Sequence, residues 1–343
     1  MVADFAVLRP SIRWGTWMKK EYDVLGVGIA AVDDLCYVSA FPEVDCKISV
    51  HSAIRQGGGP ACTAIAAVGS LGGRSAYVAR FGDNDLSRFI KSALESHGVD
   101  ISHIVHDPEG GPYHSFIVVD NSGHRNVFYN PALYRVAGAS DLPDALIQSA
   151  TLILLDHITE PSLASVAWKA RKLGVPILGD IEGQTESSKI LAQLSDYLVV
   201  PKSFAAWASG VEDPRDSCAL LARKQHLATV VTAGTEGCYF CSEKDPVVRH
   251  LSAFKVHAFD TNGCGDTFHG ALALAVARGV DVEDAITFAS AAAALKAVAG
   301  GGERRGWNAL PTLEEVIQFL QSTIEEPWRS SLLGRLELIC NPK

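Results

Sequence analysis

The sequence predicts an α/β protein with a mostly parallel, doubly wound sheet and a second, smaller sheet. Three observations carry this prediction. Apolar strands alternate with helical segments over much of the chain, which is typical of parallel sheets covered by helices. Two β-rich segments, 36–56 and 113–130, do not fit that alternation and favour a separate small sheet. The 343 residues are 48% hydrophobic and 20% charged, which is the composition of a globular protein.

The elements of the N-terminal half follow from local signals. A buried strand begins at Tyr22 and leads into a glycine-containing turn. A small-residue helix follows the run Gly57-Gly58-Gly59-Pro60 and ends near Gly72. The segment 75–83 is an apolar strand, and 86–98 is an amphipathic helix closed by a glycine. The segment 113–130 reads as two strands around the turn at 121–123.

The alternation resumes at residue 151. Expected strands lie at 151–157, 175–180, 196–201 and 228–234. Expected helices lie at 162–173, near 186–194, near 203–209, near 216–226, after residue 266, and at 285–299. We expect an N-terminal extension at 1–20, one domain at 21–325 with the two β-rich segments as a lid, and a C-terminal tail at 326–343.

Charge and cysteine content exclude several classes of protein. Thirty Lys and Arg against 39 Asp and Glu give a net charge of −9, which disfavours nucleic acid and anionic membranes as partners. No apolar run is long enough to span a membrane, and the N-terminus lacks the pattern of a signal peptide. The eight cysteines are scattered, which fits a reducing compartment. We therefore expect a cytoplasmic enzyme.

The most specific motif is Asp-Thr-Asn-Gly-Cys-Gly-Asp-Thr-Phe at 260–268, immediately before a helix of small residues. Glycines at a helix N-terminus let a ligand approach the free backbone N–H groups, and the helix dipole favours an anion there. This geometry suits a phosphoryl group in transfer. Asp266, in the first turn, is placed to accept a proton from an attacking hydroxyl.

This string resembles the C-terminal signature of the PfkB, or ribokinase-like, carbohydrate kinases, and the resemblance extends over about 22–310. It implies a three-layer α/β/α sandwich with a small β-sheet lid. It also implies transfer of the γ-phosphate of ATP to a hydroxymethyl group of a sugar. Asp266 would be the catalytic base, and Gly263, Cys264 and Gly265 would form the anion hole.

The resemblance also implies the binding residues. The segment 27–33 looks like the family's first strand, which ends in a substrate-binding aspartate, here Asp33. The expected substrate-binding residues are Asp33, Gly58, Gly59, Lys47 and Asp260. The expected nucleotide-binding residues are Thr232, Gly234, Gly237 and Ala293, the last in the helix expected beside the adenine.

The sequence departs from the family pattern in places that concern the metal. The family's usual Asn-x-x-Glu motif would fall at 201–205, where Lys202 and Ala205 stand instead. Asp180 and Glu182 are then the nearest candidate ligands for Mg²⁺, with K⁺ as a further candidate cofactor. Thr63 replaces a usual asparagine, and Cys264 replaces a usual alanine, which leaves the backbone N–H in place.

Several alternatives stay open. Lys47 matches a lysine of sulfofructose kinases, but their partner arginine is missing near Ile158. A nucleoside kinase, or a non-catalytic binding protein of this fold, is also compatible with the motifs. The fingerprint Gly26-x-Gly28-x-x-Ala31 is followed by strand residues, which disfavours a dinucleotide site. Pairing of two lids makes a homodimer a candidate assembly.

Overall fold

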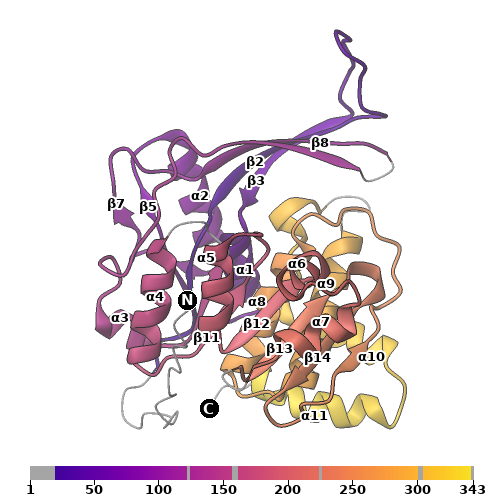
Figure 1. Ribbon diagram of the computed structural model, residues 1–343. Coiled ribbons are helices and arrows are strands. Elements are labelled where there is room, and N and C mark those ends of the chain that lie inside the picture. Colours follow the sequence, from indigo (N-terminus) through magenta and orange to yellow (C-terminus); the bar gives the residue numbers. More distant parts are fainter. Residues whose placement is uncertain (1–19, 122–123, 157–160, 224–225, 300–303, 341–343) are drawn as a thin grey trace.

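The central sheet of this computed structural model confirms the predicted α/β class. The structure describes residues 20–121, 124–156, 161–223, 226–299 and 304–340. Within them, nine strands form one sheet in the order β15-β14-β13-β12-β11-β10-β1-β4-β6, and neighbouring strands are parallel except that β14 is antiparallel to both β13 and β15 (Figure 1). The strands are β1 (Tyr22–Val27), β4 (Ser75–Val78), β6 (Val99–Asp100), β10 (Ala150–Asp156), β11 (Ile177–Asp180), β12 (Tyr197–Pro201), β13 (Ala228–Thr232), β14 (Cys238–Ser242) and β15 (Arg249–Leu251).

Helices cover both faces of this sheet and produce the predicted three-layer sandwich. On β1, Val24 packs into one apolar cluster while Leu25 and Val27 pack into the other, so the strand is buried on both faces. The first cluster includes residues of α1 (Pro60–Ser70), α2 (Asp85–Ser96), α8 (Cys264–Ala277), α9 (Val282–Val298), α10 (Leu313–Thr323) and α11 (Trp328–Cys340). The second includes residues of α3 (Asp144–Ser149), α4 (Pro161–Lys172), α5 (Glu186–Leu194), α6 (Lys202–Ser209) and α7 (Pro214–Leu221).

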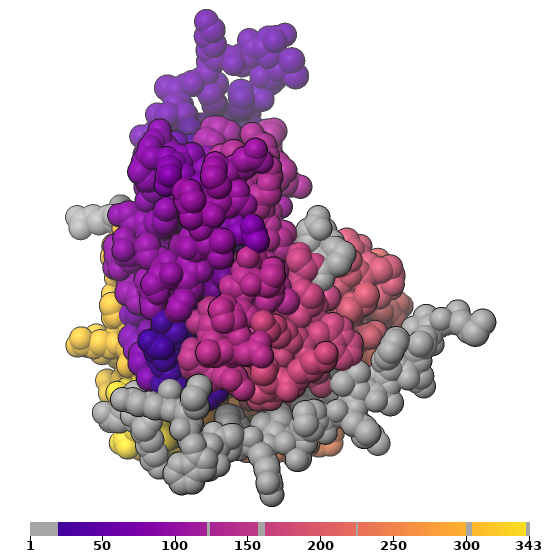
Figure 2. Space-filling view, turned by 90° about the vertical axis from the view of Figure 1, so that its left-hand side faces the viewer, coloured from indigo at the N-terminus to yellow at the C-terminus, as the bar shows by residue number. Residues whose placement is uncertain are grey.

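A small sheet above the edge of the sandwich contains strands of both β-rich segments (Figure 1). The first segment was expected at 36–56, but its first strand already begins at Ala31, and residues 38–51 contain no strand. The order of the sheet is β3 (Ser52–Gly58), β2 (Ala31–Tyr37), β8 (Tyr113–Val119) and β9 (Arg125–Asn130). We call this sheet the lid. The loop 38–51 between β2 and β3 projects beyond it, as Figures 1 and 2 show. Residues 122–123 of the predicted turn lie outside the described residues.

One expectation about the first strand is wrong. The strand does not run on to Asp33, because β1 ends at Val27 and Asp33 is the third residue of the lid strand β2. The backbone leaves the central sheet at Ile29, whose N–H donates to Asp156 Oδ2 at 2.6 Å. The Asp156 carboxylate, at the end of β10, thus accepts the Ile29 N–H in place of a neighbouring strand. From this point the chain continues into the lid.

The last described residues are packed against the rest of the domain. The segment that we described as a C-terminal tail contains helix α11, which buries Leu332, Leu336 and Ile339 in the first cluster. Residues 1–19 of the expected N-terminal extension lie outside the described residues. None of the described helices combines the length and the apolar character needed to cross a membrane.

Candidate active site

The N-terminus of α8 is built by the 260–263 turn. Gly263 caps the helix with φ of 74°, a left-handed conformation that favours glycine. The turn is held by the Asn262 N–H, which donates to Asp260 Oδ1 at 2.8 Å, and by the Thr267 hydroxyl, which donates to the Gly263 carbonyl at 2.7 Å. The first-turn N–H groups therefore form a fixed donor set at the positive end of a 14-residue helix.

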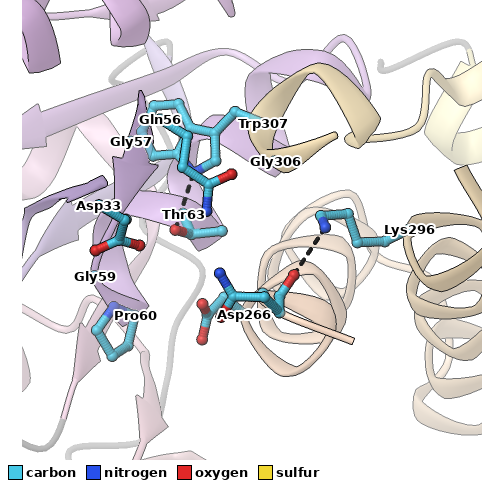
Figure 3. Close-up of a pocket in the computed structure, with 13 residues that line it drawn as sticks. Asp33, Gln56, Gly57, Gly59, Pro60, Thr63, Asp266, Lys296, Gly306 and Trp307 are labelled. Atoms are coloured by element: carbon cyan, nitrogen blue, oxygen red, sulfur yellow. Dashed lines mark hydrogen bonds between the residues drawn. The ribbon is translucent and has the colours of Figure 1, made fainter. Parts of the chain in front are cut away.

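A cavity with about 370 Å³ of empty space lies between this helix end and the lid (Figure 3). Asp266 and Gly263 face it from α8, and Asp33 faces it from β2. Its lining residues are Asp33, Gln56, Gly57, Gly58, Gly59, Pro60, Thr63, Asn262, Gly263, Asp266, Lys296, Gly306 and Trp307. The structure thus brings together the predicted base, the predicted sugar-binding aspartate and the glycine pair.

The lid side of the cavity carries polar groups that suit a hydroxylated ligand. Asp33 is 7% exposed, and burial raises the pKa of its carboxyl to about 6, although hydrogen bonds from Ser115 and Gln56 oppose the shift. Gln56 is also buried, and its Oε1 has no hydrogen-bond partner among the described residues. Buried polar groups are normally satisfied, so these two side chains offer acceptors to a ligand.

Trp307 closes one wall of the cavity. It is 5% exposed, and its indole N–H donates to Thr63 Oγ1 at 3.1 Å (Figure 3). A Cβ added at Gly57 would lie 2.6 Å from the indole ring, so only glycine lets the ring approach strand β3 this closely. Thr63 therefore has a definite role here: it anchors the tryptophan.

The electrostatics around Asp266 favour a proton acceptor of raised pKa. Its crowded surroundings desolvate the carboxyl and raise its pKa well above the ordinary value, and the charges of Glu182, Asp33 and Asp156 act in the same direction. The ammonium of Lys296 opposes this shift. A carboxylate whose pKa is moved toward neutrality is a stronger base once it is ionised.

The candidate metal ligands lie near this carboxylate. Asp180, at the end of β11, is fully buried, and neither of its carboxylate oxygens has a hydrogen-bond partner among the described residues. Burial, followed by the charge of Asp266, raises its pKa. Glu182 is exposed. The described residues contain no cluster of three or more His, Cys, Asp or Glu side chains that could hold a metal ion.

His269 is packed between these acids and the helix. Its Nδ1 lies 2.7 Å from the Gly265 carbonyl, and its Nε2 lies 3.3 Å from Asp180 Oδ1. Burial lowers the pKa of the imidazole, which favours its neutral form.

The predicted nucleotide-binding residues are not part of the cavity lining. Thr232 ends β13, and Gly234 begins the short helix Gly234–Glu236 that follows it. Gly237, with φ of 100°, closes the turn into β14, while Ala293 is a partly buried residue of α9. The end of β13 lies at the same edge of the parallel sheet as the ends of β10 and β11, where ligands of α/β folds gather.

Two predicted substrate residues lie elsewhere. Lys47 is exposed in the projecting loop 38–51 and does not line the cavity. Asp260 accepts a hydrogen bond from the Tyr37 hydroxyl at 3.4 Å and so joins the α8 turn to the lid. Of the anion-hole residues, Cys264 begins α8, and burial raises the pKa of its thiol to about 11.

Four residues that line the cavity are not among those predicted from the sequence: Gln56, Lys296, Gly306 and Trp307. Gln56 directly precedes the glycine run, which was a usable signal. Lys296 stands three residues after Ala293 in the helix expected beside the adenine, which was also a usable signal. Gly306 and Trp307 lie outside every predicted motif.

Comparison with known proteins agrees with this architecture. The sequence profile of the pfkB family carbohydrate kinases matches residues 23–304. A ribokinase of Staphylococcus aureus is 24% identical and covers 86% of this chain and 98% of its own length. A fructokinase-1 of Oryza sativa is 27% identical, and the match covers 78% of this chain and 88% of the relative's own length. The structure of Arabidopsis thaliana ribokinase complexed with ribose and ATP superposes with a TM-score of 0.74, at 20% identity, over 88% of this chain and 99% of its own.

Proposed function

Because this chain belongs to the pfkB family of carbohydrate kinases, we propose that it transfers the γ-phosphate of ATP to a hydroxymethyl group of a sugar. The observation that carries the proposal is the position of Asp266. This carboxylate lies in the first turn of α8 and faces a cavity whose opposite wall presents Asp33.

The chemistry follows from these positions. Asp33 and Gln56 accept hydrogen bonds from sugar hydroxyls and orient the acceptor. Asp266 takes the proton of the hydroxymethyl group as the new O–P bond forms. The bond between the γ-phosphorus and the β,γ-bridging oxygen breaks, and ADP leaves with that oxygen. The N–H groups of Cys264 and Gly265 stabilise the charge on the transferred group.

We assign the nucleotide to the carboxyl end of β13. Thr232, Gly234 and Gly237 would border the ribose and phosphates, and Ala293 would lie beside the adenine. Asp180 and Glu182 would supply the oxygen ligands that Mg²⁺ prefers. Neither carboxylate oxygen of Asp180 accepts a hydrogen bond from the described residues, although His269 Nε2 lies 3.3 Å from Oδ1, and this is consistent with a cation nearby. Mg²⁺ held by these two carboxylates would neutralise charge on the nucleotide phosphates.

The lid also has the features of an interface between two copies of this chain. Strand β9 is exposed along its length and forms one edge of the lid sheet. Phe116, Val127, Phe128 and Tyr129 are each 47–64% exposed on β8 and β9. Exposed apolar edge strands tend to pair, so light scattering should give the mass of a dimer.

The kinase proposal is tested by ADP release with Mg-ATP over a panel of ketoses, aldoses, nucleosides and acidic sugars. We expect turnover with a neutral sugar. A preference for a sulfonated sugar or a nucleoside would select one of the alternatives above. Absence of turnover, together with binding of sugar or ATP, would favour a non-catalytic binding protein.

A further inference from the structure

Lys296 is a buried cation in the wall of the cavity. It is the only charged residue in the alanine-rich part of α9, and it is 2% exposed. Its side chain extends from α9 toward the N-terminus of α8 (Figure 3). Lysine is rarely buried to this degree without a partner, because desolvation of its charge is costly.

The partner that the ammonium meets is a neutral one. Nζ donates to the carbonyl oxygen of Asn262 at 2.8 Å. Among the described residues, no carboxylate forms an ion pair with Nζ, and no second hydrogen bond from it is found. An ammonium group has three N–H donors, so two remain for a ligand. The negative charge of Asp266 acts on this ammonium without an ion pair, so a bound anion would complete the buried charge more directly.

The place of the Lys296 ammonium indicates which anion it would bind. A Cβ added at Gly263 would lie 3.9 Å from both Lys296 Cε and Asp266 Oδ2, so the lysine stem and the carboxylate flank the same glycine cap. The ammonium therefore lies beside the donor set at the N-terminus of α8. Positive charge at this place acts on the same negative oxygens as the helix N–H groups.

We infer that Lys296 binds the phosphoryl group in transit and stabilises its negative charge together with the N-terminus of α8. This inference rests on the proposed kinase function. Lys296 takes no part in the proton transfer. The acceptor proton goes to Asp266, and the bond changes are those described above. Its hydrogen bond to Asn262 holds the ammonium in place between turnovers.

The alternative is that Lys296 only supports the 260–263 turn. Two substitutions separate the roles. Lys296→Met keeps the length and apolar stem but removes charge and donors. Lys296→Gln removes the charge and keeps an N–H donor for the Asn262 carbonyl. A control is Lys169→Met, since Lys169 also donates to backbone carbonyls, those of Ala139 and Leu142, and lies outside the cavity, where it also pairs with Asp144.

We expect Lys296→Met and Lys296→Gln each to lower kcat by about 10²–10³-fold, the usual effect of losing one charge-stabilising donor. KM for the sugar should change little, and the Lys169→Met enzyme should keep its kcat. Retention of kcat in Lys296→Gln, or an equal loss in Lys169→Met, would overturn the inference and leave a structural lysine.

A binding measurement keeps the inference testable if the proposed function fails. Tripolyphosphate without metal is the probe, titrated calorimetrically into the wild-type protein and Lys296→Met. We expect the affinity of the variant to fall about 10-fold, as for loss of a charge-assisted hydrogen bond. If the wild type shows no turnover with any acceptor, the kinase proposal fails. Equal tripolyphosphate affinities of the wild type and Lys296→Met would overturn the role of Lys296, whatever the turnover.

Discussion

Gly58 lies directly against the carboxylate of Asp33: a Cβ added at Gly58 would come within 2.1 Å of Asp33 Oδ2. The contact arises because β2 and β3 pair antiparallel, with Ala31 opposite Gly58 and Asp33 opposite Gln56. The Asp33 carboxylate therefore packs directly on the backbone of β3. A side chain at residue 58 would collide with it, which explains why this position is glycine.

Gly58→Ala should therefore displace the Asp33 side chain. We expect sugar affinity to fall at least about 10-fold, since hydrogen bonds weaken steeply with small changes of geometry. Binding of ATP, which we place beside β13, should persist. Calorimetric titration of sugar and ATP separately checks this, and unchanged sugar affinity would show that Asp33 does not hold the acceptor.

Asp33→Asn tests the carboxylate directly. The amide keeps the size but loses the charge, so sugar binding should weaken by about 1.5–3 kcal/mol, the range for hydrogen bonds to charged groups. Asp34→Asn is the matched control, because Asp34 is the next residue on β2 and pairs with Arg55 and His114 instead of lining the cavity. Comparable losses in both variants would indicate general damage to the lid.

Sugar affinity should depend on pH through Asp33. Burial raises the pKa of this carboxyl to about 6 from 3.8, while the charges of Asp34 and His114 act in opposite directions on it. The ionised form accepts the hydroxyl hydrogen bonds, so affinity rises with pH and levels off above the pKa. At pH 5 only about a tenth of the sites would be ionised, which weakens apparent binding about 10-fold. A dissociation constant that is flat from pH 5 to 8 in the wild type would exclude this role.

Gly265→Ala should lower the affinity for ATP without lowering the stability of the fold. A Cβ at Gly265 meets nothing within 4 Å, and replacing glycine by alanine in a helix stabilises by up to about 1 kcal/mol. The added methyl would enter the space that we assign to the transferred phosphate, so ATP affinity should fall while the melting temperature is kept or raised. Gly334→Ala is the control, since its Cβ also meets open space but it stands in α11 and not in the first turn of α8. Equal ATP affinity in the two variants would contradict the anion-hole assignment.

The parts of the site that sequence predicts well are local. The cap at Gly263 and the acid at Asp266 are three residues apart, so helix geometry alone places them together. The step from strand to lid was misplaced because it depends on Asp156, which lies more than a hundred residues from the Ile29 backbone that it binds.

The missed residues have the same physical origin. Lys296 stands in a helix that the sequence places beside the nucleotide, but the rotation of α9 decides whether its ammonium meets solvent or the cavity, and local patterns do not give that rotation. Trp307 reaches the site through a hydrogen bond to Thr63, 244 residues earlier. Contacts across such separations are set by tertiary packing, which local patterns do not contain.

The most direct test compares kcat of the wild type and Asp266→Asn with Mg-ATP and the best sugar of the panel. Asparagine keeps the size of the side chain but cannot accept the proton of the hydroxymethyl group. We predict that kcat falls about 10²–10⁴-fold, the range for losing a general base, while the separately measured affinities for ATP and sugar change little. Near-normal turnover by Asp266→Asn would contradict the mechanism and direct attention to another carboxylate, Asp180 first.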